Sequence, residues 1–489
     1  MNPSSSPHLH IDPNTPVNGV CERESDHQGV TLKYLRYFSH TIGDFPLEMA
    51  AILAFPKTPG PHPALLHLHG GAQCANAGIA LAWAERGYVT LCPDWSVPAN
   101  MHQSAHATRW PDNTPPAHES LLEAEDATIG HVVRGVRHGI SLLAALPEVQ
   151  ADRIGMVGIS WGGLMTWLVN GTDTRLRTAI ALYGSGRTAG HPMSESWRKN
   201  FQPESVAAAQ HAPILHLNGT HDFFGHLETS EALLKKVGPK ARRFYVPNED
   251  HGLNESARQC AWAWLDLHLR GDGQLPPEPD AHPTPGKRFF HARSMDRSAV
   301  WRELPAGPLP EAGCGYITET HPNGLAFSSP VYKGPPQATH ASPVLWDHKT
   351  QGLDGFYLRW EQENLAVHTP AKARLQLNEH GVGFTPAVNS FRVFLRCEAA
   401  PDLPQAHLRV TLFAPKGTRV QLRGYPQPEI EETSVREFED QRCEQDGIQT
   451  LVFRPKSSCI PTDLKVLHLA LTPSDATTPE LYLQRVEWG

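Results

Sequence analysis

The chain of 489 residues lacks several features that mark whole classes of protein. No apolar run approaches the roughly 18 residues that a membrane-spanning helix requires. The net charge of −8 is spread out without a basic block, which argues against nucleic acids and membranes as main partners. Eight cysteines show no C-x-x-C spacing and are too dilute for a disulfide scaffold, so we expect mostly reduced thiols. A globular chain with room for two or three domains remains.

The first residues also lack a targeting signal. Residues 1–7, MNPSSSP, have neither the charged nor the apolar region of a signal peptide. This favours a cytoplasmic location, although a chain trimmed of its leader would look the same. Residues 1–28 are polar and rich in Pro, Ser and Asn, so we expect an N-terminal tail there.

Between residues 29 and 272, short apolar strands alternate with helical segments. A hairpin at 32–55 comes first, and the buried strands are predicted at 64–69, 88–92, 154–157, 178–183, 213–218 and 242–246. The helices are predicted at 79–86, 121–146, 227–237 and 257–269. This alternation predicts an α/β domain with a mainly parallel, doubly wound sheet that is covered on both faces.

The sequence pattern changes after residue 272. Residues 273–286 are Pro-rich and are expected to form a linker. From 287 to 489 the helical periodicity disappears, and short alternating segments separated by turn residues replace it. This half is predicted to be an all-β sandwich or jelly-roll domain.

A G-x-S-x-G pattern at residues 158–162 lies between a buried strand and a helix. That is the setting of a nucleophile elbow, in which a serine stands at the apex of a strained turn. The flanking glycines have a steric reason, because a Cβ at either position would crowd the neighbouring strand and helix. We therefore predict that Ser160 is a nucleophile, against the alternative of an ordinary strand-to-helix turn.

A serine nucleophile needs a base, and the base needs a carboxylate that orients it. After such an elbow the partners follow in the chain order Ser, acid, His. Asp222 and His251 each lie just past the carboxyl end of a later predicted strand, where sites gather in open α/β sheets. We assign Asp222 as the orienting carboxylate and His251 as general base and acid, with Asp250 a less favoured acid. Taken singly, Asp222 could be a turn residue and His251 a surface histidine.

Two backbone N–H groups are expected to stabilise the oxyanion. One belongs to Trp161, directly after the nucleophile, and the other is assigned to Gly71, in the loop after the first buried strand. Gln73 in the same loop is a candidate substrate-binding residue.

The segment at 96–120 has four prolines, three histidines and no clean periodicity. It should emerge on the same sheet edge as the elbow, so we predict that it forms part of the acyl or alcohol pocket and that Trp110 contacts the substrate. Trp95, Trp110 and Trp161 are candidates for an aromatic wall. The alternatives are a surface excursion and aromatics that anchor the core.

Histidine pairs are the only hint of a metal. His67 and His69 have a spacing that some sites use, and His221 and His226 lie near the predicted acid, but no further ligand cluster accompanies either pair. We therefore expect no metal and no cofactor.

Several segments resemble the acetyl xylan esterase and dienelactone hydrolase branch of the α/β-hydrolases. They are HLHGG at 67–71, AERGYV at 84–89, DRIG at 152–155 and GISWGG at 158–163. The segment KARRFYVPNEDHG at 240–252 is similar to the PhoPQ-activated pathogenicity-related group. The resemblance covers roughly residues 30–270. It implies the α/β-hydrolase fold and hydrolysis of small acyl esters, often acetyl groups on carbohydrates, without a cofactor.

Two departures from this resemblance matter. Dienelactone hydrolases use a cysteine nucleophile where this chain has Ser160. The minimal esterases have no counterpart of the β-rich half, which is similar at the fold level to the sandwich of cocaine-esterase-like and X-Pro dipeptidyl peptidase enzymes.

Together, these features predict a serine carboxylesterase that cleaves short-chain acyl esters, with acetyl esters of carbohydrates among the candidates, through a Ser-His-Asp triad and an acyl-enzyme. The expected partner is a small-molecule or carbohydrate ester, and the oligomeric state is left open. The β-domain should pack against the hydrolase domain and narrow the cleft. Two alternatives remain: a prolyl-oligopeptidase-like serine peptidase, and an inactive hydrolase that acts as a carbohydrate-binding protein.

Overall fold

The computed structural model describes most of the chain. The described residues are 6–97, 105–186, 191–271, 275–280, 286–297, 299–305, 307–308, 310–335, 344–347, 349, 356–357, 373–378, 381–386, 391–396, 407–426, 435–456, 464–472 and 481–488.

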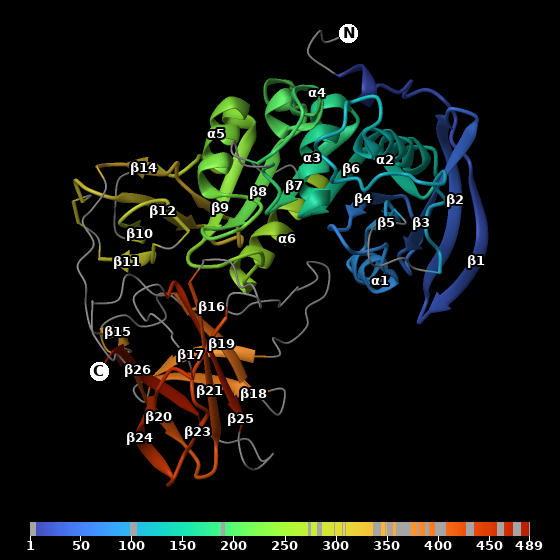
Figure 1. Ribbon diagram of the computed structural model, residues 1–489. Coiled ribbons are helices and arrows are strands. Elements are labelled where there is room, and N and C mark those ends of the chain that lie inside the picture. Colours follow the sequence, from blue (N-terminus) through green and yellow to red (C-terminus); the bar gives the residue numbers. More distant parts are fainter. Residues whose placement is uncertain are drawn as a thin grey trace.

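A nine-stranded sheet forms the N-terminal half, in the order β1-β2-β3-β5-β4-β6-β7-β8-β9 (Figure 1). Its first strands pair antiparallel, and those from β5 to β9 are all parallel. The strands are β1 Gly19–His27, β2 Val30–Ile42, β3 Phe45–Phe55, β4 His62–Leu68, β5 Val89–Pro93, β6 Val149–Ile159, β7 Leu176–Leu182, β8 Ile214–Gly219 and β9 Ala241–Val246. The parallel part of the sheet brings the carboxyl ends of six neighbouring strands to one edge.

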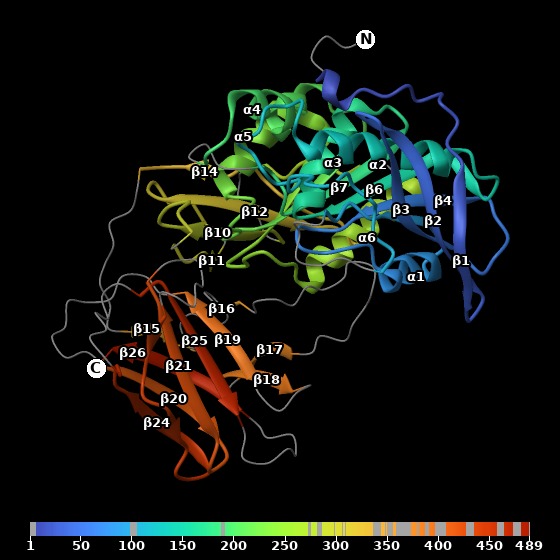
Figure 2. The same ribbon diagram turned by 45° about the vertical axis from the view of Figure 1, so that its right-hand side comes forward.

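Helices cover both faces of this sheet, as Figures 1 and 2 show. The helices are α1 Ala77–Glu85, α2 Thr128–Ala144, α3 Trp161–Thr172, α4 Glu195–Phe201, α5 Leu227–Val237 and α6 Glu255–Leu269, with short 3-10 turns η1 Pro7–Leu9, η2 Pro203–Ala209 and η3 Gly238–Lys240. Leu66 and Met156 belong to the core under α2 and α3, whereas Leu65 and Val157 belong to the core under α1 and α6. Alternate residues of one strand therefore serve opposite layers, and the predicted doubly wound α/β-hydrolase fold is confirmed.

The segment expected to be an N-terminal tail contains the edge strand β1. It pairs antiparallel with β2, from Gly19 opposite Tyr37 to His27 opposite Val30. A tight turn joins the two strands, in which Gln28 and Gly29 have positive φ values of 54° and 90°. The side chains of β1 are almost all exposed, so the strand carries no apolar alternation that would have revealed it in the sequence.

A separate five-stranded sheet follows, and it differs from the expectation that residues 287–489 form one sandwich. Its order is β11-β10-β12-β13, with β14 paired to β12. The strands are β10 Arg288–Ala292, β11 Arg302–Leu304, β12 Cys314–Thr320, β13 Ala326–Ser328 and β14 Tyr332–Lys333. Phe290, Trp301 and Tyr316 share a core with Leu233 of α5 and Tyr245 of β9. The sheet is therefore joined to the hydrolase half through a common apolar core.

Two six-stranded antiparallel sheets contain the described strands that follow β14, and they are drawn in orange and red in Figure 2. One contains β15 Val344–Asp347, β17 Ala373–Asn378, β18 Gly381–Pro386, β20 Leu408–Ala414, β24 Gly447–Phe453 and β26 Tyr482–Trp488. The other contains β16 Phe356–Tyr357, β19 Phe391–Arg396, β21 Arg419–Tyr425, β22 Arg436–Glu437, β23 Gln441–Arg442 and β25 Val466–Thr472.

One apolar core takes side chains from both of these sheets, for example Val410 of β20 and Leu469 of β25. The predicted change from an α/β region to a β-rich region is confirmed. Among the described residues, no helix is both long and apolar enough to cross a membrane.

Candidate active site

Ser160 occupies the sharp turn between β6 and α3. Its backbone has φ 56° and ψ −115°, a conformation that non-glycine residues rarely adopt. Two hydrogen bonds hold the turn: the Ser160 N–H donates to the Leu182 carbonyl at 2.9 Å, and the Leu164 N–H donates to the Ser160 carbonyl at 2.9 Å. Strain of this kind persists only where the surroundings enforce it, and it is common at functional sites.

The glycines on either side of Ser160 are required by close packing. A Cβ on Gly158 would lie 2.1 Å from the carbonyl oxygen of Gly162 and 2.2 Å from Thr166 Oγ1. A Cβ on Gly162 would lie 2.6 Å from the carbonyl oxygen of His69. These distances agree with the steric reason inferred from the sequence, since no side chain fits at either position.

The structure brings Ser160, His251 and Asp222 into one hydrogen-bonded chain. Asp222 follows β8 and His251 follows β9, so both loops lie at the edge of the sheet where Ser160 ends β6. His251 Nε2 lies 2.8 Å from Ser160 Oγ, and His251 Nδ1 lies 2.6 Å from Asp222 Oδ2. The three residues thus have the geometry that nucleophile activation requires.

The Asp222 carboxylate is fully buried and is held from both sides. Oδ1 accepts hydrogen bonds from the N–H of Phe224, at 2.7 Å, and from the N–H of Gly225. Oδ2 faces His251. Because both oxygens have donors, the buried charge is compensated and the carboxylate has a fixed orientation.

Asp250, the less favoured acid, is directed elsewhere. Its Oδ1 lies 3.6 Å from Nη2 of Arg297, which is on the segment between β10 and β11. Asp222 is therefore the carboxylate that contacts the imidazole.

The loop after β4 lies against the nucleophile. A Cβ on Gly70 would be 3.3 Å from Ser160 Cβ, and one on Gly71 would be 2.7 Å from Trp161 Cδ1. Gln73 Oε1 accepts a hydrogen bond from the Gly70 N–H at 2.8 Å. Gln73 therefore shapes the loop that carries Gly71, and both predicted oxyanion donors belong to segments next to Ser160.

His69 fixes the start of this loop. Its Nδ1 lies 2.8 Å from the Gly70 carbonyl, and its Nε2 accepts from the Trp95 N–H at 3.1 Å. The Trp95 ring stacks on the imidazole at 4.6 Å, and its indole N–H donates to the His69 carbonyl. His67 accepts from the Trp83 indole at 3.2 Å, and burial lowers its pKa to about 3. These neutral histidines hold the loop. Within the described ranges, no cluster of three or more potential metal ligands occurs.

The three tryptophans proposed as a wall lie in different environments. Trp95 is fully buried, and Trp110 is 7% exposed and donates its indole N–H to the Ser96 carbonyl at 2.8 Å. Both belong to the core under α2 and α3, which is the anchoring alternative. Trp161 is only partly buried and lies next to the nucleophile. Part of the 96–120 segment, residues 98–104, lies outside the described residues, so a contact between Trp110 and a substrate stays a prediction.

Sequence reasoning missed the aromatic side chains that surround His251. The rings of Tyr183 and Phe223 lie 4.3 and 4.5 Å from the imidazole, and Phe224 lies 5.0 Å from the ring of Trp161. Burial is the main cause that raises the pKa of the Tyr183 hydroxyl above its usual range. Tyr183 directly follows β7, and the two phenylalanines directly follow Asp222. Their positions in the loops after the strands are the sequence feature that could have placed them near the site.

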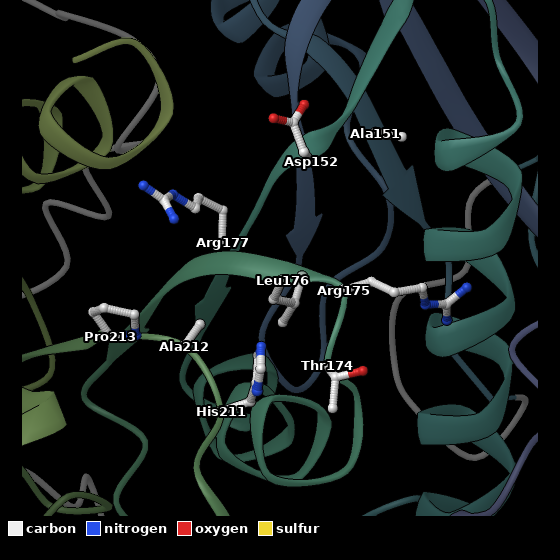
Figure 3. A pocket seen from close by; sticks show the side chains of 9 residues that line it. All are labelled: Ala151, Asp152, Thr174, Arg175, Leu176, Arg177, His211, Ala212 and Pro213. Atoms are coloured by element: carbon white, nitrogen blue, oxygen red, sulfur yellow. The ribbon is translucent and has the colours of Figure 1, made fainter. Parts of the chain in front are cut away.

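The structure also contains a cavity of about 450 Å³, and Figure 3 shows the residues that line it. Its lining residues come from the amino-terminal parts of β6 and β7 and the segment before β8, and they are Ala151, Asp152, Thr174, Arg175, Leu176, Arg177, His211, Ala212 and Pro213. Ser160 lies past the carboxyl end of β6, so this cavity is at the opposite edge of the sheet. The Arg175 guanidinium is already held by Asp173, Ser141 and two carbonyl groups.

The sheet order, the helical layers and the strained turn define an α/β-hydrolase fold. Residues 49–264 match the model of the dienelactone hydrolase family, which confirms the resemblance to that family over this part of the chain.

Two curated relatives and one solved structure illustrate the range of similar proteins. The "Putative carboxymethylenebutenolidase" of Escherichia coli (strain K12) is 31% identical over 109 residues, which are 22% of this chain and 38% of that protein. The "Uncharacterized peptidase YuxL" of Bacillus subtilis (strain 168) is 26% identical over 153 residues, 25% of this chain and 23% of that protein. The chain thus spans well under half the length of these curated relatives. The structure of acetyl xylan esterase from Paenibacillus sp. R4 has a TM-score of 0.44 and 16% identity, covering 52% of this chain and 89% of that one.

Proposed function

We propose that the protein is a serine carboxylesterase that cleaves short-chain acyl esters. The observation that carries this proposal is the hydrogen-bonded chain from Ser160 through His251 to Asp222, with distances of 2.8 and 2.6 Å, on a strained elbow. The match of residues 49–264 to a hydrolase family supports the same reaction class.

In the proposed mechanism, Ser160 Oγ attacks the ester carbonyl carbon while His251 Nε2 takes its proton. Asp222 accepts the hydrogen bond from His251 Nδ1–H and thereby keeps Nε2 free of a proton before the attack. The imidazolium then protonates the departing alcohol, which leaves an acyl group on Ser160. A water molecule activated by His251 releases the acid and restores the serine.

The negative charge of the tetrahedral intermediate needs donors in the loop after β4 and at the start of α3. We assign these roles to the backbone N–H groups of Gly71 and Trp161. The contact between the Gly71 position and the Trp161 ring supports this assignment, because it keeps the two backbone segments together beside Ser160. Donors fixed before the reaction stabilise charge without reorganisation.

Aromatic side chains supply the substrate-facing surface in this proposal. Phe223 is 47% exposed, and together with the partly buried Phe224 and Trp161 it offers apolar ring faces next to His251, whereas the buried Tyr183 packs against the imidazole. Ring faces of this kind can pack against a short acyl chain, a sugar ring or a planar lactone. Acetylated sugars therefore remain candidate substrates, and the names of the relatives add butenolides, which are cyclic esters.

The test compares Ser160→Ala with wild type and with Ser25→Ala, a control at a partly exposed serine of the edge strand β1. Hydrolysis of p-nitrophenyl acetate should fall on the order of 10⁴-fold or more in Ser160→Ala and stay unchanged in the control. A Ser160→Ala protein with wild-type turnover would refute the proposal. A panel of acyl chain lengths on aryl esters, sugar acetates and lactones would then define the substrate.

A serine peptidase is the second candidate, and the similarity to a protein named as a peptidase favours it. It would use the same three side chains. Faster cleavage of a Pro- or Ala-nitroanilide than of an acetyl ester would reverse our ranking. A folded sample that no fluorophosphonate probe labels would instead favour an inactive, carbohydrate-binding protein, because only an activated serine reacts with such a probe.

A further inference from the structure

The segment at 293–301, between β10 and β11, contacts both loops that carry the partners of Ser160. It belongs to the five-stranded sheet that follows the hydrolase half, and residue 298 within it lies outside the described residues. In Figures 1 and 2 the strands β10 and β12 lie beside the β9 end of the large sheet, whereas the two six-stranded sheets lie farther off.

The first set of contacts is with the acid loop, next to Asp222. Arg297 Nε donates to the His221 carbonyl at 2.8 Å, and His221 Nε2 lies 2.7 Å from the Ala299 carbonyl. A carbonyl only accepts, so Nε2 carries the proton, and His221 Nδ1 accepts from the Thr220 hydroxyl at 3.0 Å. The residue before Asp222 is thus bound to the 293–301 segment through both its backbone and its side chain.

The second set of contacts is with the histidine loop. Asn248 Nδ2 donates to the Trp301 carbonyl at 2.8 Å, and the Trp301 N–H donates back to Asn248 Oδ1 at 2.9 Å. The Asn248 N–H also donates to Thr220 Oγ1 at 2.8 Å, which joins the histidine loop to the acid loop. Asn248 is 3% exposed, so these hydrogen bonds lie in a buried environment where a lost partner is costly.

An ion pair between Arg297 and Asp250 adds to these hydrogen bonds. Arg297 is 7% exposed, and its Nη2 lies 3.6 Å from Oδ1 of Asp250, the residue directly before His251. The pair holds this second carboxylate away from the imidazole. The two loops are also tightly packed, since a Cβ on Gly219 would lie 2.3 Å from the Glu249 carbonyl oxygen. A shift of one loop is therefore transmitted to the other.

We propose that the 293–301 segment positions the candidate active site, with Arg297 and the Asn248–Trp301 hydrogen bonds fixing Asp222 and His251 relative to Ser160. The inference rests on the proposed function, because it assigns a positioning role within that mechanism. Arg297 and Asn248 act through the loops and touch no reacting atom. The five-stranded sheet is consequently part of the catalytic unit, although it follows the segment that matches the hydrolase family.

The experiment uses the full-length protein with Asn248→Gly, Arg297→Gln and Arg297→Lys. Glycine is chosen because Asn248 has a φ of 62°, which glycine adopts freely, so the variant loses the amide hydrogen bonds without added backbone strain. Arg288→Gln is the matched control, since Arg288 lies on the same sheet but is exposed and pairs with Glu303.

We expect kcat for p-nitrophenyl acetate to fall on the order of 10- to 100-fold in Asn248→Gly and Arg297→Gln, because small misplacements of reacting groups have effects of that size. KM should change by less than about twofold, since the ester-contacting surface is untouched. Arg297→Lys should recover part of kcat by restoring the positive charge beside Asp250, and Arg288→Gln should match wild type.

The outcomes separate the two proposals. Wild-type kcat in folded Asn248→Gly and Arg297→Gln, with Ser160→Ala inactive, overturns the positioning role and leaves the proposed function intact. An active Ser160→Ala overturns the proposed function and the positioning role with it. If either variant fails to fold, Asn248→Asp decides, since it keeps an acceptor for the Trp301 N–H and replaces the donor with an oxygen that faces the Trp301 carbonyl. Unchanged kcat then overturns the inference, and a reduced kcat with unchanged KM supports it.

Discussion

Replacing Asp222 with asparagine preserves the shape of the side chain and reverses one hydrogen bond. Asp222 Oδ1 accepts from two backbone N–H groups, of Phe224 and Gly225, which only an oxygen can satisfy. The asparagine oxygen must therefore take that place, and its NH2 group must point at His251 Nδ1. The imidazole then has to accept at Nδ1 and carry its proton on Nε2, facing Ser160 Oγ. In that tautomer it cannot take the serine proton.

The expected loss of kcat for p-nitrophenyl acetate is on the order of 10⁴-fold, the size found when a serine-protease triad is trapped in the wrong tautomer. The melting temperature should change little, because the two hydrogen bonds from the loop remain. Asp250→Asn is the matched control, and its loss should be at least about 100-fold smaller, since Asp250 faces Arg297. If folded Asp222→Asn kept more than about a tenth of wild-type kcat, or if Asp250→Asn were the more damaged protein, the assignment of the acid would be wrong.

Three further predictions address stability and the pocket. Burial lowers the pKa of His216 to about 4, so the unfolded chain, with its histidine near 6.5, binds the proton more tightly. The contribution of His216 to the free energy of unfolding is therefore fully present above about pH 6.5, and acidification to pH 5 lowers that free energy by about 2 kcal/mol through this residue. Equal urea midpoints at pH 7.5 and pH 5 would contradict this. A chain ended after residue 335 should fold and keep esterase activity, whereas one ended after 275 should aggregate or lose activity. The soluble yield and labelling by a fluorophosphonate probe would measure this, and an active 1–275 chain would refute the role of the five-stranded sheet. Phe223→Ala should raise KM for aryl esters with little change in melting temperature, because the side chain is half-exposed. Trp110→Ala should lower the melting temperature, because its indole is buried and hydrogen-bonded. An unaltered substrate profile in either variant would remove that residue from the pocket.

The parallel sheet and the hydrogen-bonded trio could be predicted because their signals are local. Each buried strand is a short apolar run; Ser160 directly follows one such run, and Asp222 and His251 lie in the loops that follow two others. Parallel pairing then brings these positions to one edge without further information. Strand β1 escaped detection because an exposed edge strand needs no apolar side chains.

Other features depend on contacts between distant segments. The sequence between 287 and 489 reads as one series of strands, and nothing in the alternation of β10 or β12 tells which core they join. Phe290 and Tyr316 are apolar in either case, yet they pack with Tyr245 of β9. Trp95 and Trp110 were equally ambiguous, because a large aromatic serves a core and a binding surface equally well.

The shared core between the five-stranded sheet and the hydrolase half also affects the order of folding during synthesis. Domains generally fold from the N-terminus as they leave the ribosome. Here the ribosome adds Tyr245 and Cys260 before it adds Phe290 and Ala326, the residues that pack on them. The apolar side of β9 and α6 is consequently uncovered for a period of translation, and a pause before residue 333 would prolong exposure to chaperones or to aggregation. Ser160 would gain its full environment only after translation has passed well beyond the last residue of the hydrolase sheet.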